Sequence, residues 1–122
     1  MKKSLIVLGH GSKAPEATET LAAVTAMVRE KTAYDRVDYA SLQLSEPDLA
    51  EVVRDQAATG MGQITVLPFL IAVGQHVKID IPEALAELGR QLPEVEIRLA
   101  GPLGADPRLA EILVERAQEM ER

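Results

Sequence analysis

Four short apolar segments, separated by stretches with helical periodicity, are the feature that most strongly constrains the fold of this chain. The apolar segments cover residues 4–8, 36–44, 64–70 and 95–100. The first is apolar throughout after Ser4, as expected for a strand buried on both faces. Strands that alternate with helices in this way predict right-handed crossovers and a parallel sheet with helices on its faces.

The stretches between the apolar segments place Leu, Val and Ile at helical spacing. The expected helices cover residues 15–31, 45–58, 80–89 and 107–120. Ser45, Asp80 and Asp106 stand where the second, third and fourth helices would begin, so each is a candidate helix cap. In the last helix, Leu109, Ile112 and Leu113 are expected to face the core.

The resulting order βαβαβαβα predicts an α/β fold of three layers, with a mainly parallel four-stranded sheet in a single domain over residues 1–122. The fourth apolar segment alternates apolar and charged residues, which favours an edge position. A common strand order for such sheets is 2-1-3-4, which would make the first and third strands neighbours.

Composition excludes several classes of protein. The chain has 13 Lys and Arg against 19 Asp and Glu, a net charge of −6, with 47% hydrophobic residues. This balance excludes intrinsic disorder and argues against a nucleic-acid partner. No apolar run approaches the ~18 residues of a membrane span, and the N-terminal apolar stretch is too short for a signal peptide, so no membrane association and a cytoplasmic location are expected. The lack of cysteine removes disulfides and thiolate metal sites.

Both histidines of the chain fall where ligands bind in open α/β sheets, outside the carboxyl ends of the strands. His10 directly follows the first expected strand, and His76 follows the third within an apolar loop. One histidine in such a turn is more often a cap or a solvated residue, but two of two at this edge favour a function. Two imidazoles suit an open site for Co²⁺, Ni²⁺, Fe²⁺ or Zn²⁺, and a neutral imidazole can accept a proton.

The turn around His10 permits other interpretations. A phosphate-binding loop is one, but the Gly-x-x-x-x-Gly-Lys-Ser/Thr spacing is missing. A histidine phosphatase is another, but Gly9 stands where its phosphate-binding arginine would precede the histidine. A non-catalytic metal carrier that uses the two histidines remains an alternative to an enzyme.

Other residues at this edge have both a structural and a functional interpretation. Glu46 either interacts with the dipole of the second helix or brings a carboxylate to the cleft. Lys13 and Lys78 are either solvated or provide positive charge for an anionic substrate. Residues 70–73 form either a buried loop core or an apolar shelf for a flat ligand or a partner subunit.

Four segments carry a family resemblance. They are Leu-Gly-His-Gly-Ser-Lys-Ala-Pro-Glu at 8–16, Leu-Ser-Glu-Pro-Asp-Leu at 44–49, Leu-Pro-Phe-Leu-Ile-Ala-Val-Gly-Gln-His-Val-Lys-Ile-Asp-Ile-Pro at 67–82, and Gly-Pro-Leu-Gly-Ala-Asp-Pro-Arg-Leu-Ala at 101–110. Together they resemble the short class II chelatases of the CbiX/SirB family. The segment from residue 68 to residue 82 is the most specific of the four.

The resemblance implies a chelatase-like domain that inserts Co²⁺, Ni²⁺ or Fe²⁺ into sirohydrochlorin without ATP, in cobalamin or siroheme biosynthesis. It implies no permanently bound cofactor, since the metal is a substrate, and a homodimer as the working unit. His10 and His76 would be the catalytic and metal-binding residues, with His10 also the candidate proton acceptor. The implied substrate-binding residues are Gly11, Ser12, Glu46, Ile71, Ala72, Val73, Gly74 and Gln75.

Overall fold

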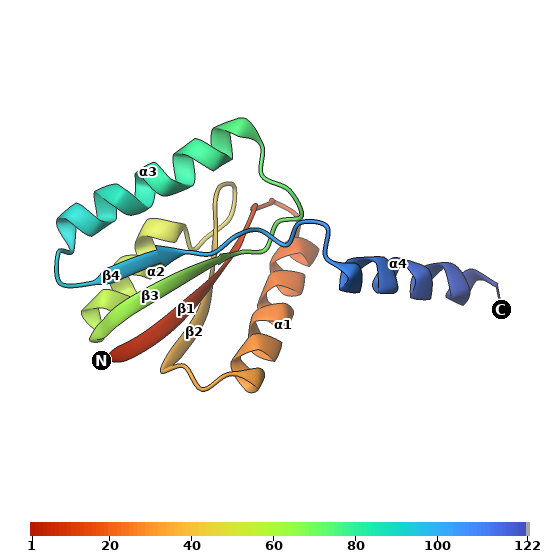
Figure 1. Cartoon of the computed structure of the whole chain (residues 1–122), viewed down its shortest axis with the longest axis horizontal. Coiled ribbons are helices and arrows are strands. Elements are labelled where there is room, and N and C mark those ends of the chain that lie inside the picture. The colour runs from red at the N-terminus through yellow and green to blue at the C-terminus, as the bar shows by residue number, and fades with distance from the viewer. Residues whose placement is uncertain (122) are drawn as a thin grey trace.

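The computed structural model describes residues 1–121 and alternates strands with helices along the whole chain (Figure 1). The elements are β1 (Lys2–Gly9), α1 (Pro15–Lys31), β2 (Arg36–Ser41), α2 (Leu49–Ala58), β3 (Met61–Pro68), α3 (Gln75–Gln91), β4 (Glu96–Leu99) and α4 (Pro107–Met120). The strands are parallel and lie in the order β2-β1-β3-β4. The predicted α/β class, the strand order and the edge position of β4 are confirmed.

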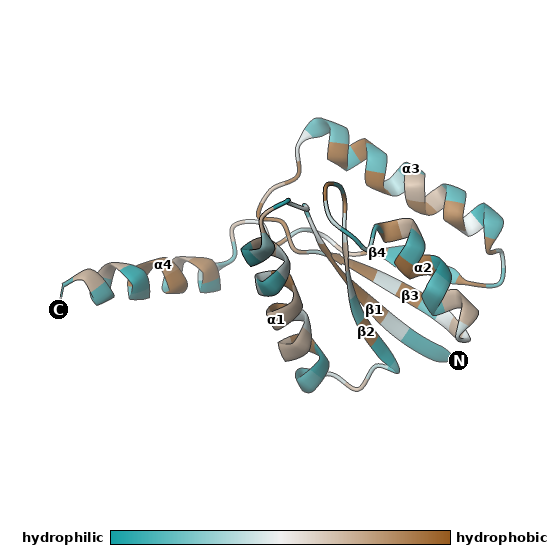
Figure 2. Cartoon of the chain, turned by 180° about the vertical axis from the view of Figure 1, so that it is seen from behind, coloured by the Kyte–Doolittle hydropathy of each residue, from teal (hydrophilic) through white to brown (hydrophobic). Residues whose placement is uncertain are grey.

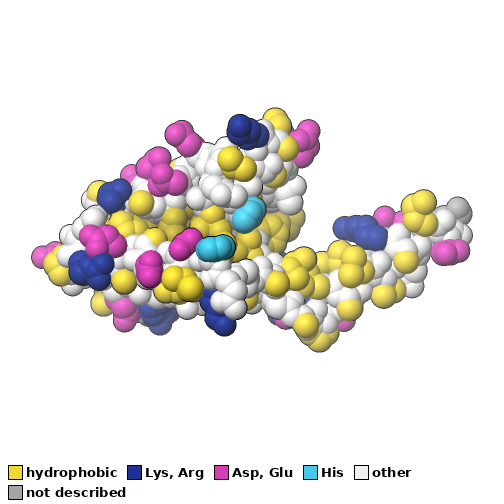
Figure 3. All heavy atoms as spheres, turned by 90° about the horizontal axis from the view of Figure 1, so that it is seen from above, with side chains coloured by type: hydrophobic (Ala, Val, Ile, Leu, Met, Phe, Trp, Pro, Cys, Tyr) yellow, Lys and Arg dark blue, Asp and Glu magenta, His cyan; other side chains and the backbone are white. Residues whose placement is uncertain are grey.

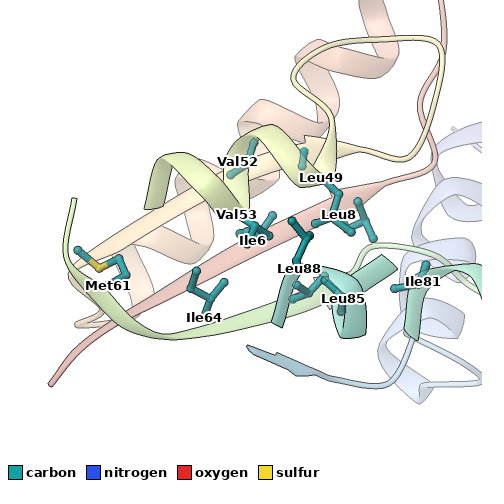
Figure 4. Packing of buried hydrophobic residues seen from close by; sticks show 12 residues of the cluster. Ile6, Leu8, Leu49, Val52, Val53, Met61, Ile64, Ile81, Leu85 and Leu88 are labelled. Carbon is teal, nitrogen blue, oxygen red and sulfur yellow. The ribbon is translucent and has the colours of Figure 1, made fainter. Parts of the chain in front are cut away.

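The main core lies between the sheet and the two helices α2 and α3. Alternate residues of the central strands, among them Ile6 and Leu8 of β1 and Ile64 of β3, are fully buried there. Val53 of α2 and Leu85 of α3 pack against them (Figure 4). This packing fixes β1 and β3 side by side, so the segments that follow them leave the sheet at the same edge.

A buried hydrogen-bond network joins α2 to the sheet. The Gln56 side chain accepts a hydrogen bond from the Ser4 hydroxyl at 2.6 Å. Its amide nitrogen donates to the Leu5 carbonyl at 3.1 Å and to the Asp38 carboxylate at 2.9 Å. Gln56 is fully buried, so these bonds satisfy a polar group that would otherwise be costly to bury.

The third layer of the sandwich is incomplete. α1 covers β1 and β2 on the face opposite α2 and α3. Within residues 1–121, α4 contacts no other helix or strand and projects away from the body (Figure 1). The expectation that Leu109, Ile112 and Leu113 face the core is therefore wrong: Ile112 is 45% exposed and Leu113 70% exposed. Apolar periodicity shows that a helix is amphipathic, but it does not show what covers the apolar side.

Two of the three expected caps are also wrong. The cap of α2 lies three residues later than expected, because Asp48, not Ser45, accepts the Glu51 backbone N–H at 2.9 Å. Asp80 lies inside α3, which begins at Gln75 after Gly74. Asp106 is confirmed as the cap of α4, and its carboxylate accepts the Arg108 N–H at 2.9 Å.

None of the helices within residues 1–121 is both long and apolar enough to cross a bilayer.

Candidate active site

The turn that carries His10 depends on the two glycines beside it. Gly11 has φ +99°, and a Cβ there would lie 1.7 Å from the Gln43 carbonyl oxygen. A Cβ on Gly9 would lie 2.9 Å from a methyl carbon of Leu21 on α1. The Gly-His-Gly sequence thus lets the turn pack tightly between α1 and the β2–α2 loop, which fixes His10 at the end of β1.

His10 opens into a cavity between the ends of the strands and the helices α2 and α3. The cavity has a volume of about 360 Å³, and Gln43, Asp48, Val77 and Asp80 line it together with His10. The Nε2 atom of His10 lies 3.3 Å from Nε2 of Gln43. His10 itself is exposed, so its ring can reach a ligand that enters this cavity.

His76 lies in the first turn of α3 and not in a loop, contrary to the expectation from sequence. The apolar loop is shorter than predicted because the helix begins at Gln75, five residues before Asp80. His76 is exposed, and its neighbour Val77 lines the cavity that His10 enters. Figure 3 shows both histidines on the same face of the molecule, beside an apolar surface. The fold thus brings both histidines to one edge of the sheet, as predicted.

Sequence reasoning missed Gln43 and Asp80 as residues of this cavity. The residues around Gln43 were expected to continue the second strand, but β2 ends at Ser41 and a loop carries Gln43 toward His10. Asp80 follows His76 by four residues, so the two share one side of α3. That spacing was visible in the sequence and would have placed Asp80 at the site, had the helix start been predicted correctly. No group of three or more His, Asp or Glu within residues 1–121 is placed to hold a metal ion.

The segment before α3 presents apolar side chains to solvent. Ile71 is 66% exposed, Ala72 is exposed and Val73 is half-buried, so the buried-core interpretation of this loop is wrong. Val73 and Lys78 line a second, largely apolar cavity of about 520 Å³ between α3 and the end of β4. The loop therefore exposes apolar side chains near the histidines, and its use as a shelf for a flat ligand or a partner subunit stays a prediction.

Other predicted residues lie around this edge but outside the cavity between His10 and α3. Glu46 is exposed in the loop before α2, ahead of the helix cap, and does not line that cavity. The Ser12 hydroxyl accepts the Ala14 N–H at 3.0 Å and so stabilises its own turn. Gly11 and Ser12, together with His10, line a neighbouring cavity of about 330 Å³ on the α1 side of the turn. Lys13 is exposed and makes no ion pair among the described residues.

The sequence is similar to known proteins over nearly its whole length. The family model CbiX matches residues 4–120. The sirohydrochlorin cobaltochelatase of Sulfurisphaera tokodaii is 37% identical over 118 residues, which cover 97% of this chain and 92% of that protein. The sirohydrochlorin cobaltochelatase of Methanopyrus kandleri is 32% identical, with 95% of each chain covered.

Two solved structures are similar to this chain in both fold and sequence. The putative cobalamin biosynthesis CbiX protein of Marinobacter aquaeolei matches with a TM-score of 0.80 and 30% identity, over 97% of this chain and 96% of that chain. The sirohydrochlorin chelatase SirB of Bacillus subtilis subspecies spizizenii, solved in complex with cobalt, matches with a TM-score of 0.89 and 27% identity. That match covers 98% of this chain and 51% of SirB, so this chain spans about half of SirB. The family model covers nearly the whole sequence, and the chain therefore belongs to the CbiX family.

Proposed function

We propose that this protein inserts a divalent metal ion, Co²⁺ or else Ni²⁺ or Fe²⁺, into sirohydrochlorin without ATP. The observation that carries the proposal is the placement of His10 and His76 at one edge of the sheet, next to an exposed apolar loop. The names of the similar proteins support the substrate, since two of them are sirohydrochlorin cobaltochelatases and SirB was solved with cobalt.

The chemistry requires a base and a weak metal-binding group. Metal insertion removes two pyrrole N–H protons and places one M²⁺ in the ring, so two positive charges leave as two enter. We assign proton acceptance to His10, which the glycine turn holds next to Gln43. His10 accepts the two protons one after the other and, because it is exposed, passes each of them to water. His76 delivers the metal, because a neutral imidazole at an exposed helix end binds borderline cations and can release them.

The macrocycle needs a surface as well. Ile71, Ala72 and Val73 provide an apolar shelf, and Gly74 has no atom within 4 Å of a Cβ position, so its backbone is open to a close approach. Sirohydrochlorin carries several carboxylates. The free N–H groups at the start of α3, around Gln75, favour such anions. Lys13 and Lys78 add positive charge nearby, whereas Glu46, Gly11 and Ser12 would contact the rim of the substrate.

The working unit in this proposal is a homodimer. A single sheet edge offers a shallow cleft for a macrocycle, and exposed apolar residues such as Ile71 are typical of surfaces that a partner covers. A two-fold dimer would bring two copies of this loop together. Ile71→Asp is expected to weaken both the dimer and metal insertion, measured by sedimentation equilibrium at micromolar protein and by turnover.

The visible absorption spectrum of sirohydrochlorin tests the activity. Pure protein with Co²⁺, Ni²⁺ or Fe²⁺ is expected to speed the spectral conversion to the metallated ring, compared with metal alone. Metal binding without faster conversion would instead support the carrier alternative. The same rates with and without protein, for all three metals, would overturn the proposal.

A further inference from the structure

The cavity on the α1 side of His10 has a lining that the assigned roles do not explain. Its walls come from the turn after β1, the first turns of α1 and the loop after β2. Figure 2 shows the start of α1 and these two loops at the same end of the sheet. Because His10 lines this cavity as well as the cavity toward α3, a ligand that lies over the imidazole can extend into both.

Hydroxyl groups make up most of the polar lining of this cavity. They belong to Ser12, Thr18, Thr20, Ser41 and Ser45. None of the Asp and Glu residues within residues 1–121 lines the cavity, although the chain carries a net charge of −6. The lining therefore lacks the negative charge that would repel an anion from this part of an acidic protein.

Ser41 and Ser45 together hold one hydroxyl hydrogen that has no acceptor in the described part of the chain. Ser41 is 2% exposed, and its Oγ lies 3.0 Å from the Oγ of Ser45. The Ser45 oxygen also accepts the Ser12 backbone N–H at 3.3 Å. Two hydroxyls that bond to each other use one of their two hydrogens, so one is left whichever of them donates. Since both residues line the cavity, this hydrogen is available to an acceptor inside it.

The start of α1 adds to the same wall. Thr18 is half-buried, and its hydroxyl makes no hydrogen bond within residues 1–121. Ala14 precedes α1 and provides no side-chain cap, so the positive end of the dipole of this 17-residue helix is not neutralised by a capping group. Glu16 and Glu19 of the first turns are exposed and lie outside the lining. The cavity thus combines free hydroxyl donors with a helix end that favours negative charge.

A carboxylate matches this lining. Its two oxygens only accept hydrogen bonds when it is ionised, so it pairs with hydroxyl donors, and such bonds to a charged group are strong. A cation would find no carboxylate in the lining, and an apolar group would leave the hydrogen of the Ser41–Ser45 pair without an acceptor. A volume of about 330 Å³ is too small for a tetrapyrrole but holds one of its short carboxylate arms.

We propose that this cavity is a subsite for one carboxylate arm of the tetrapyrrole, bound by the hydroxyls of Ser41, Ser45 and Thr18. The inference rests on the proposed function and deepens it, since it names the residues that orient the substrate. An arm anchored on the α1 side of His10 holds the ring across the imidazole. Such orientation favours proton transfer from the pyrrole nitrogens, because it keeps the reacting groups together.

Binding of sirohydrochlorin without metal tests the subsite, measured by the change in its visible absorption as protein is added. Thr18→Val and Ser41→Ala each remove one hydroxyl with little change in volume. Each is expected to raise the dissociation constant at least about tenfold, as the loss of a hydrogen bond to a charged group does. Thr32→Val is the matched control at the other end of α1, where the Thr32 hydroxyl donates to the Val28 carbonyl, and it should change the constant less than twofold.

Acetate is the probe for a free small carboxylate. In the wild-type protein, millimolar acetate is expected to shift the amide NMR signals of residues 10–18 and 41–45, and sirohydrochlorin should displace it. Urea unfolding checks that each variant is folded, and Thr18→Val keeps the test valid if Ser41→Ala is destabilised, because Thr18 is only half-buried.

The outcomes separate the subsite from the proposed function. Unchanged sirohydrochlorin binding in both Thr18→Val and Ser41→Ala would overturn the subsite, and would leave metal insertion to be judged by its own spectral assay. Acetate that binds here and is not displaced by sirohydrochlorin would show a site for a free small carboxylate, and would overturn its assignment to the substrate. A wild-type protein that binds no sirohydrochlorin would overturn the subsite and the proposed function together.

Discussion

The two imidazoles are held in different ways, and this difference predicts different roles. His10 follows a buried strand in a turn that has no room for a Cβ at Gly11. We expect His10→Ala to lower the rate of metal insertion by at least about 100-fold with metal saturating, because the proton acceptor is lost. The initial rate of sirohydrochlorin conversion measures this. Unfolding by urea should be almost unchanged, since His10 is exposed; turnover close to wild type would remove His10 from the catalytic role.

His76 stands at the exposed start of a helix, where a ligand can exchange easily. His76→Ala is expected to lower the rate on the order of tenfold at limiting metal, and excess metal should restore much of it, because delivery is weakened and not the proton transfer. The initial rate, measured as a function of Co²⁺ concentration, separates a loss of metal delivery from a loss of proton transfer. Equal losses in His10→Ala and His76→Ala that no metal concentration restores would show that the two residues act as one unit.

Gly11 and Gly101 make a matched pair of backbone tests. Gly11→Ala is expected to destabilise the fold by more than about 2 kcal/mol, because φ is positive there and the new methyl group meets the Gln43 carbonyl. Gly101→Ala should change stability by less than about 0.5 kcal/mol, since no atom lies within 4 Å of its Cβ position. Urea unfolding measures both. Similar stabilities for the two variants would mean that the turn around His10 is not the rigid support described above.

At the scale of elements, Gln56 joins α2 to the central strand β1 and to the edge strand β2. Gln56→Ala is expected to cost about 3 kcal/mol of stability, because it opens a cavity and removes the partners of the Ser4 hydroxyl and the Leu5 carbonyl. Gln91→Ala is the control: its side chain is exposed and bonds only Glu87 and Arg54. A loss of less than 1 kcal/mol for Gln56→Ala would mean that water replaces the network readily.

The helices and strands also show which parts of the structure can be predicted from the sequence. Strand alternation, the strand order, and the limits of α1 and α4 were predictable because each depends on local periodicity and on the chirality of crossovers. The start of α3 was not, because Gly74 offers no side-chain cap and the apolar residues after it resemble a loop. That error hid Asp80, which lines the His10 cavity. The exposure of Leu113 was unpredictable for another reason: what covers a helix is a property of tertiary or quaternary structure.

At the scale of the whole molecule, the net charge of −6 raises the question of how the protein binds a substrate with several carboxylates. Charges close to the bound substrate affect its binding more than the net charge does, since exposed charges farther apart than about 8 Å are largely screened at physiological ionic strength. The start of α3 and Lys78 lie beside the apolar shelf, and Arg36 pairs with both Asp38 and Asp55 at the β2 edge. The Asp55 and Asp38 carboxylates hold the pKa of Arg36 above its usual value, as expected for an arginine that pairs with two acids.

The proposed dimer also predicts how stability depends on protein concentration. If folding and association are coupled, the unfolding midpoint rises with concentration, because dilution favours the separated unfolded chains. Two chains of 122 residues have a combined unfolding enthalpy of about 170 kcal/mol at about 0.7 kcal/mol per residue, which gives a rise of about 3 °C for each tenfold increase in concentration. Calorimetry at about 5, 50 and 500 μM protein measures this rise in the unfolding midpoint. Ile71→Asp should remove the dependence and the exposed control Gln91→Ala should keep it. A wild-type midpoint that is constant over this range would show that the domain unfolds as an independent unit, without coupling to association.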